Sequence, residues 1–117
     1  MAERRRHPRH RATFPVQIDT ERKKQRLGVA RNASVSGVLL GTGSRFDAGE
    51  RVSLALQFHG KAQEWRVSGR IVRVGSDRAS DWFSRILAVE FDQALPEIEA
   101  LLDQTEREQA EIRTTSF

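Results

Sequence analysis

The residues best suited to chemistry in this chain are arginines gathered near its beginning. The first eleven residues contain one glutamate and five arginines, which are Arg4, Arg5, Arg6, Arg9 and Arg11. Arg5 and Arg9 form an R-x-x-x-R pair, and Pro8 between them keeps the segment extended. Four extended residues span up to about 13 Å, so the two guanidinium groups can reach different parts of one ligand. The charge indicates an anionic partner, either a nucleic acid or a smaller, doubly charged molecule.

A second group of polar residues follows in the stretch Asn32-Ala33-Ser34-Val35-Ser36-Gly37. On a strand, Asn32, Ser34 and Ser36 share one face, because successive side chains alternate. Short polar side chains offer donors and acceptors while leaving space above them, and Gly37 lacks the Cβ that would block a ligand. Taken by itself, the stretch is also typical of a polar strand end with local side-chain turns.

Alternating apolar residues indicate the strands that must position these groups. Phe14, Val16 and Ile18 share one face, and similar alternation recurs along the chain with glycine-bearing gaps. Pro8 and Pro15 exclude an ordinary helix around the first of these segments. The pattern predicts strands at about 14–20, 26–33, 36–42, 50–58, 64–74 and 85–91.

The hydrophobic period changes near the end of the chain, where the sequence predicts one helix. Pro96 suits the first helical position, and Ile98, Leu101 and Leu102 form an apolar stripe. Beyond this stripe nearly all residues are polar, so we expect the segment from Gln104 onward to project, fray or pair with another chain. Six short strands and one helix predict a mainly β fold, either a small antiparallel barrel or a sandwich.

Length and composition limit the classes of function. A chain of 117 residues makes one domain, and 38% apolar residues are too many for overall disorder. Residues 1–31 hold ten basic and three acidic residues, a net +7, whereas residues 90–117 hold two basic and eight acidic residues, a net −6. The sequence has no cysteine, signal peptide or apolar run of membrane-spanning length, so we expect a cytoplasmic protein without membrane insertion.

No catalytic motif is evident. No carboxylate or third histidine accompanies His7 and His10 in the sequence, so we interpret them as solvated residues rather than metal ligands. Because no nucleophile–base pair or carboxylate pair can be assembled, we expect neither enzyme activity nor a metal. Trp82 and Phe83 lie in a long gap between the last two strands. Either one or both rings fold back as a cap on the barrel, or they form an exposed anchor for a protein partner.

Taken together, the arginine pair before the first strand and the N-x-S-x-x-G pattern that begins at Asn32 resemble the PilZ domain. RATFPVQI is similar to the first strand of that family, NASVSGVLL to its signature hairpin and RILAVEF to its closing strand. The resemblance implies a six-stranded antiparallel β-barrel with a C-terminal α-helix. It divides the chain into a flexible, arginine-rich ligand-binding arm (1–13), the barrel (14–92), and a C-terminal helix and tail (93–117). PilZ domains of this type are receptors for the second messenger cyclic di-GMP.

The resemblance also implies a role for each matching residue. Arg5 and Arg9 would bind guanine edges and phosphates from the arm, because a guanidinium group can donate two hydrogen bonds to either. Asn32 and Ser34 would bind from the barrel, and Gly37 would leave room for the ligand. Asn32 stands where the family often has aspartate. Ligand capture would fold the arm over the mouth of the barrel.

Two further expectations depend on this resemblance. PilZ domains with an extra arginine at the position of Arg4 tend to hold two stacked ligands, so we expect two cyclic di-GMP molecules per protomer. Some members place a tryptophan on the fifth strand against the guanine, and near that position this chain has Ile71. A stand-alone receptor would relay its signal through a downstream protein effector that the sequence does not identify.

Two other functions fit part of the sequence. A nucleic-acid-binding module would use the basic arm and the Arg22–Arg26 segment, and its binding would fall steeply with salt and ignore Asn32 and Ser34. A PilZ-like adaptor would have lost nucleotide binding, against which the intact arginines and the intact N-x-S-x-x-G pattern both argue. We therefore expect cyclic di-GMP rather than nucleic acid as the partner.

Overall fold

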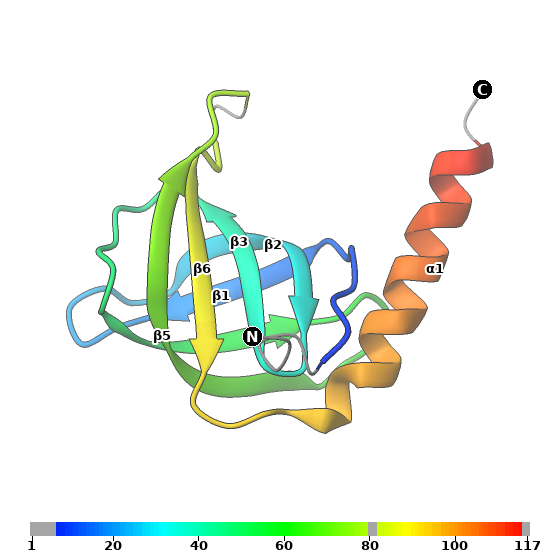
Figure 1. Cartoon of the computed structure of the whole chain (residues 1–117), viewed down its shortest axis with the longest axis horizontal. Helices are drawn as coiled ribbons and strands as arrows, with labels where there is room; N and C mark the ends of the chain where they lie inside the picture. The colour runs from blue at the N-terminus through cyan, green and yellow to red at the C-terminus, as the bar shows by residue number, and fades with distance from the viewer. Residues whose placement is uncertain (1–6, 80–81, 116–117) are drawn as a thin grey trace.

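Six antiparallel strands close into a barrel, and one helix lies at its side (Figure 1). The computed structural model describes residues 7–79 and 82–115. The strands are β1 (Phe14–Asp19), β2 (Arg26–Ser34), β3 (Gly37–Thr42), β4 (Arg51–Gln57), β5 (Glu64–Ser76) and β6 (Arg85–Phe91). They pair in the closed order β1-β2-β3-β6-β5-β4. A short 3-10 helix, η2 (Pro96–Ile98), leads into α1 (Glu99–Thr115). The predicted six-stranded barrel with a C-terminal helix is confirmed.

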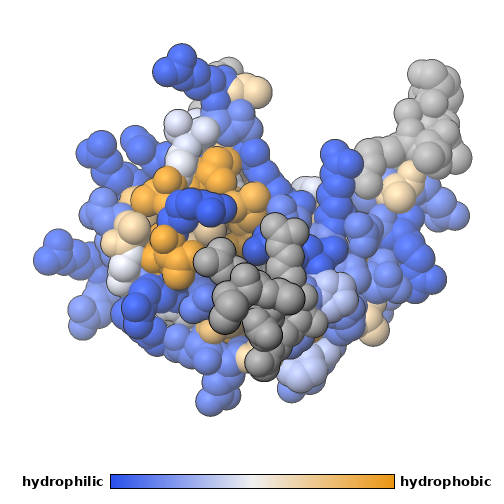
Figure 2. Space-filling view, in the orientation of Figure 1, coloured by the Kyte–Doolittle hydropathy of each residue, from blue (hydrophilic) through white to orange (hydrophobic). Residues whose placement is uncertain are grey.

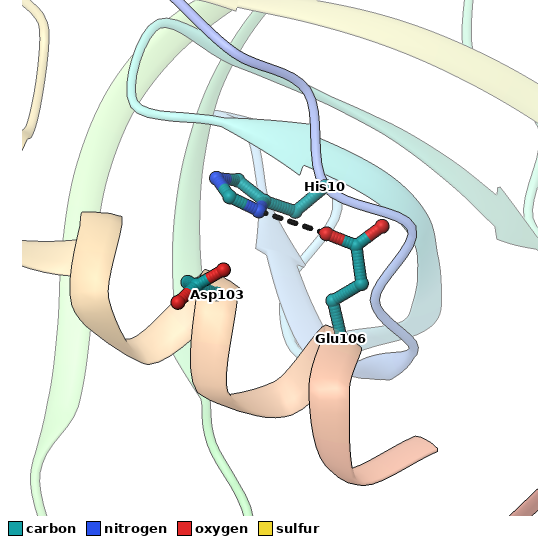
Figure 3. Close-up of side chains that lie close together, drawn as sticks. All are labelled: His10, Asp103 and Glu106. Atoms are coloured by element: carbon teal, nitrogen blue, oxygen red, sulfur yellow. Dashed lines mark hydrogen bonds and ion pairs between the residues drawn. The ribbon is translucent and has the colours of Figure 1, made fainter. Parts of the chain in front are cut away.

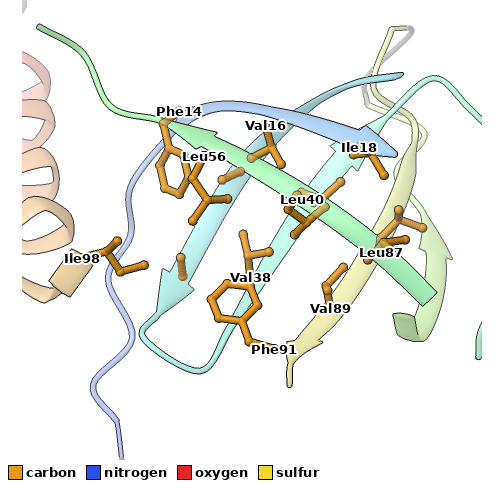
Figure 4. Packing of buried hydrophobic residues seen from close by; sticks show 14 of the residues in the cluster. Phe14, Val16, Ile18, Val38, Leu40, Leu56, Leu87, Val89, Phe91 and Ile98 are labelled. Carbon is orange, nitrogen blue, oxygen red and sulfur yellow. The ribbon is translucent and has the colours of Figure 1, made fainter. Parts of the chain in front are cut away.

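The barrel is filled by the apolar faces that the alternating pattern predicted. Phe14, Val16 and Ile18 of β1 are buried, while the residues between them are not. Figure 4 shows these side chains packed with apolar side chains from the other strands. Phe14 also contacts Phe58, with 4.7 Å between the ring centroids. Fully burying one such side chain contributes about 1.5–3 kcal/mol to stability. The packed interior therefore stabilises the barrel, whose outer faces carry the other side chains of the strands.

Two β-bulges interrupt the regular pairing. The register shifts between Ala30 and Asn32 in β2, and between Ile71 and Arg73 in β5. A bulge adds one residue to one strand of a pair and changes the direction of the side chains around it. In β5, Ile71 remains in the core, whereas Val72 beside it is 52% exposed.

The start of the helical region closes one end of the barrel. Pro96 occupies the first turn of η2, as the sequence predicts. Ile98 and Leu102 are fully buried in the barrel core, and Leu101 packs against that core half-buried. The predicted apolar stripe is therefore present, with Ile98 and Leu102 as its fully buried members. No helix in the described part of the chain has the length and apolar content needed to cross a bilayer.

The arm residues that precede β1 lie between β2 and α1 (Figure 1). His10 pairs with Ala33 of β2 through two backbone hydrogen bonds of 2.7 and 3.0 Å. From the opposite side, Glu106 and Gln109 of α1 bind the arm. Two expectations are thereby wrong. His10 is buried rather than solvated, and the helix beyond Gln104 does not lack a partner, because its polar side chains hydrogen-bond the arm.

The loop between β5 and β6 leaves an aromatic ring outside the barrel. Trp82 is 81% exposed, whereas Phe83 is half-buried. The backbone of Phe83 passes so close to Gly41 that a Cβ at Gly41 would lie 2.8 Å from the Phe83 carbonyl oxygen. Trp82 therefore does not cap the barrel, and the expectation that one or both rings do so can hold only for Phe83.

Candidate ligand-binding groove

A groove of about 510 Å³ lies on the outside of the barrel, where β3, β5 and β6 face the arm. Figure 2 shows apolar side chains gathered on this face of the molecule among mostly hydrophilic ones. Sites for small molecules are commonly about 300–1,000 Å³ and combine an apolar lining with a few polar groups. The lining of this groove includes the apolar residues Leu39, Val72 and Ala88 and the polar or charged residues His7, Arg9, Ser34, Arg73 and Glu90.

Arg9 reaches the groove from the arm and contacts the strand motif. Its Nη1 donates a hydrogen bond to Oδ1 of Asn32 at 3.1 Å on the exposed surface. The structure thus brings together two of the residues that the sequence predicted for the site. Because a guanidinium carries five N–H donors, this contact uses only a small part of its capacity. Arg4 and Arg5 lie outside the described residues.

Ser34 ends β2, and Ser36 lies in the two-residue turn to β3. The Ser34 hydroxyl accepts the Ser36 N–H at 3.1 Å, and its oxygen lies 3.0 Å from the Ser36 Oγ. The local side-chain turn that the sequence left open is therefore present. Ser34 also lines the groove, although it is only 7% exposed. A hydroxyl that accepts this N–H retains a hydrogen to donate, so the turn and a ligand contact are compatible.

Gly37 begins β3 at a point where an added side chain would press against the backbone of β6. A Cβ at this position would lie 2.7 Å from the Val89 carbonyl oxygen on β6. Backbone packing therefore requires a glycine here whether or not a ligand binds. Gly37 also lines the groove, so the room that it was expected to leave for a ligand stays a prediction.

The bulge in β5 supplies two groove residues that the sequence did not indicate. Ile71, which was compared with the tryptophan of some relatives, is fully buried in the core and cannot face a ligand. Val72 and Arg73 both line the groove instead. Strict alternation would have placed one of these two side chains inside the barrel, so a pattern of period two could not have found both.

The charges around the groove suit an anionic ligand with flat, apolar surfaces. Arg9 and Arg73 supply guanidinium groups from the arm and from β5, and His7 adds an imidazole. Glu90 is the one carboxylate in the described lining, so the cationic groups outnumber it. Between these charges, Val72 and its apolar neighbours offer a surface against which a ring can pack. The arrangement can therefore bind phosphates and an aromatic base together.

A cluster of charged side chains holds the arm beside the groove. Nε2 of His10 lies 2.8 Å from Oε2 of Glu99, and Nδ1 lies 3.0 Å from Oε1 of Glu106. Burial disfavours a charge on the ring. The hydrogen bonds to the two carboxylates outweigh that effect and raise the pKa of His10 above its ordinary value. Figure 3 shows Glu106 and Asp103 of α1 on the side of the helix nearest His10.

The sequence interpretation missed this cluster because it looked for carboxylates close to the histidines along the chain. One signal was present. Glu99, Asp103 and Glu106 are spaced by four and three residues, which places them on one face of a helix. Single ligand atoms of His10, Asp103 and Glu106 lie within 4.8 Å of one another, so carboxylates do accompany His10 in space.

The fold and the groove define a small β-barrel domain with a basic arm packed along one strand. The family description of the PilZ domain matches residues 3–106, so the chain belongs to the PilZ domain family. Among proteins with curated descriptions, none matches the chain.

Solved structures that share the fold include the following three. The inhibitor of motility MotI of Bacillus subtilis is 23% identical, with a TM-score of 0.66 over 92% of this chain and 52% of its own. The PilZ domain of Escherichia coli YcgR, solved with c-di-GMP, is 16% identical, with a TM-score of 0.72 over 97% of this chain and 99% of its own. A longer YcgR structure in complex with c-di-GMP is 17% identical, with a TM-score of 0.68 over 95% of this chain and 50% of its own. This chain thus spans about half the length of MotI and of the longer YcgR chain.

Proposed function

We propose that this chain is a receptor for cyclic di-GMP and that the groove beside Arg9 is its binding site. The observation that carries the proposal is the hydrogen bond between Arg9 and Asn32, which joins the arginine arm to the N-x-S-x-x-G motif at the groove. Membership of the PilZ family supports it, as does the presence of c-di-GMP in the similar YcgR structures. The function is ligand sensing rather than catalysis.

The proposed contacts follow from the chemistry of the lining. Arg9 donates paired hydrogen bonds to a guanine edge or to phosphate oxygens, with Arg5 acting from the part of the arm outside the described residues. Asn32 and Ser34 bind from the end of β2. Val72 provides apolar surface against which a base packs, while Gly37 lets the ligand approach the backbone of β3.

We propose further that two cyclic di-GMP molecules bind per protomer. Arg4, Arg5 and Arg6 place three positive charges next to one another, more than the two phosphates of one ligand balance. Two stacked ligands carry four phosphate charges and balance them better. Arg4→Leu should therefore shift the stoichiometry toward one ligand while some affinity remains through Arg9.

The signal passes to another protein in this proposal. Binding at the groove covers apolar surface and fixes Arg9 on the ligand, which changes the surface that a partner meets. The similar structure of MotI, an inhibitor of motility, is consistent with a regulator that acts on a protein target. The partner would thus distinguish ligand-bound from free receptor by the covered groove and by the position of the Arg9 side chain.

Isothermal titration calorimetry with cyclic di-GMP tests the site. We expect saturable binding by the unmodified chain and a loss of roughly tenfold or more in Arg9→Ala, since charge-assisted hydrogen bonds contribute about 1.5–3 kcal/mol each. Arg22→Ala is the matched control, because Arg22 is an exposed arginine on the β1–β2 turn and does not line the groove. Its affinity should equal that of the unmodified chain.

A second ligand tests recognition of the base. Cyclic di-AMP has the same phosphates but lacks the guanine O6 acceptor that pairs with arginine, so it should bind much more weakly. Equal binding of both dinucleotides, or equal loss in Arg9→Ala and Arg22→Ala, would refute the assigned site. Binding to DNA that falls steeply with salt and survives alanine at Asn32 and Ser34 would instead favour the nucleic-acid alternative.

A further inference from the structure

His10 connects the elements that meet at the groove. Its backbone pairs with Ala33 inside the strand motif, its ring binds Glu99 and Glu106 of α1, and Arg9 immediately precedes it. We infer that His10 is a positioning residue. Its protonated ring, held between the two carboxylates, fixes the course of the arm and thereby sets the affinity of the groove for its ligand. We call the arrangement of the His10 ring between Glu99 and Glu106 the clasp. The effect on affinity rests on the proposed function, whereas the clasp can be tested without ligand.

The geometry of the clasp indicates the charged form of the ring. Both ring nitrogens lie within hydrogen-bond distance of a carboxylate oxygen, at 2.8 Å to Glu99 and 3.0 Å to Glu106. A neutral imidazole has only one N–H, so it would leave a lone pair facing one of these oxygens, whereas the imidazolium donates to both. The side chain of His10 is only 9% exposed, and a charge so nearly buried needs such partners.

The helix holds the arm beyond His10 as well. Oε2 of Glu106 accepts the Arg11 N–H at 3.0 Å, while its Oε1 faces the ring of His10. Gln109 accepts the Thr13 N–H and donates to the Thr13 carbonyl oxygen, both at 2.8 Å. These contacts tie the arm to α1 at three positions between His10 and Thr13. The arm is therefore bound to the helix along most of its course from His10 to the start of β1.

An arm fixed in this way binds ligand more tightly than a free one. Arg9 extends from a backbone that is already ordered, so less conformational entropy is lost when the ligand arrives. If only a fraction of molecules has the arm in place, the apparent dissociation constant rises by the inverse of that fraction. Loss of the charge on His10 lowers this fraction, because the neutral ring satisfies only one of the two carboxylates.

The charged groups around His10 determine the pH range of the effect. Histidine is the side chain whose charge ordinarily changes near neutral pH, and His10 is the histidine in the clasp. The clasp is complete below the ordinary pKa of histidine, about 6.5, and is lost as the pH rises through the raised pKa of His10. Glu99 and Glu106 of α1 bind the ring, and Asp103, which itself binds Arg107, presents a carboxylate oxygen within 4.8 Å of it. Arg9 and Arg11 adjoin His10 in the chain, and on β2 its neighbour is the uncharged Ala33.

The same cluster offers ligand atoms to a divalent cation, since His10, Asp103 and Glu106 each present one within 4.8 Å. A metal would have to displace a proton from the ring and compete for Asp103, which binds Arg107 at 2.9 Å. The observed contacts are already satisfied by a proton on each ring nitrogen. They therefore favour the clasp, and metal binding becomes an outcome for the experiment to exclude.

Calorimetry of cyclic di-GMP binding between about pH 6 and pH 8, in buffer containing a chelator, tests the inference. The dissociation constant of the unmodified chain should rise by about threefold or more across this range. The dissociation constant can rise by at most about tenfold for each unit by which the pKa of His10 in the clasped arm exceeds its pKa in the released arm. In His10→Gln the affinity should be weaker at the lower pH and no longer vary with pH.

His59→Gln is the matched control, because His59 is an exposed histidine that does not line the groove. This change should leave both the affinity and its pH slope as they are in the unmodified chain. A slope that disappears in His59→Gln and persists in His10→Gln would overturn the inference. So would a slope that appears only when zinc replaces the chelator, because the cluster would then be a metal site.

Nuclear magnetic resonance of the ligand-free chain separates this inference from the proposed function. The ring of His10 should titrate above about pH 6.5, and Glu106→Gln should lower that pKa by removing one carboxylate. An ordinary titration of His10 would overturn the clasp. Absence of cyclic di-GMP binding at every pH, with a raised His10 titration, would overturn the proposed function and the effect on affinity but leave the clasp in place.

Discussion

Replacing Gly37 with alanine distinguishes a packing role of this glycine from a ligand role. The added Cβ would lie 2.7 Å from the carbonyl oxygen of Val89 and 3.7 Å from the Cα of Glu90. Both atoms belong to the backbone of β6, so neither can rotate away as a flexible side chain would. Overpacking of this kind costs about 1–3 kcal/mol. We therefore expect Gly37→Ala to lower the free energy of unfolding by about that amount and the melting temperature by roughly 4–15 °C.

Urea and thermal unfolding followed by circular dichroism measure this loss, and calorimetry measures ligand binding in the same samples. Gly75→Ala is the control, because a Cβ at Gly75 would meet nothing within 4 Å. Its stability should stay within about 0.5 kcal/mol of the unmodified chain. If Gly37→Ala unfolds like the unmodified chain and yet loses cyclic di-GMP binding, the packing argument is refuted and the glycine serves the ligand.

Three further outcomes follow from the helix and the arm. Leu102→Ala should lower the free energy of unfolding by about 2–5 kcal/mol. Leu101→Ala should lower it by less, because Leu101 is only half-buried whereas Leu102 is fully buried. Thermal denaturation of the two variants checks this order. Removing every residue after Asp103 should speed hydrogen exchange at the Thr13 amide, which loses its Gln109 acceptor, while amides in the middle of β1 keep their protection. The stability of the unmodified chain should fall as the pH rises from about 6 through the raised pKa of His10, and His10→Gln should flatten this dependence in urea midpoints measured against pH.

The fold could be predicted because its signals are local. Phe14, Val16 and Ile18 alternate within a few residues, and the first strand predicted at 14–20 is observed at Phe14–Asp19. The order of the strands around the barrel is not a local property, and the choice between a barrel and a sandwich came from the family resemblance. Pro96 likewise marked the start of the helical region through its fixed backbone angle.

The site was only partly predictable because much of it depends on contacts between distant segments. Arg9 and Asn32 lie in recognisable motifs, and the structure brings them together. Val72 enters the groove through a bulge that leaves no signature in an alternating pattern. The partners of His10 lie 89 and 96 residues away, so no spacing along the chain connects them. What the sequence does contain is a basic arm and an acidic C-terminal segment, whose opposite charges give no indication of which residues meet.

The contacts between the arm and α1 have a consequence for synthesis, because they join residues 89 to 96 positions apart. At about 5–20 residues per second, a ribosome makes the arm roughly 5–20 s before it makes the helix residues that hold it. During that interval His10 has no carboxylate to bind, so the arm cannot be held beside the groove before the helix is made. The groove therefore reaches its final form only with the last segment of the domain.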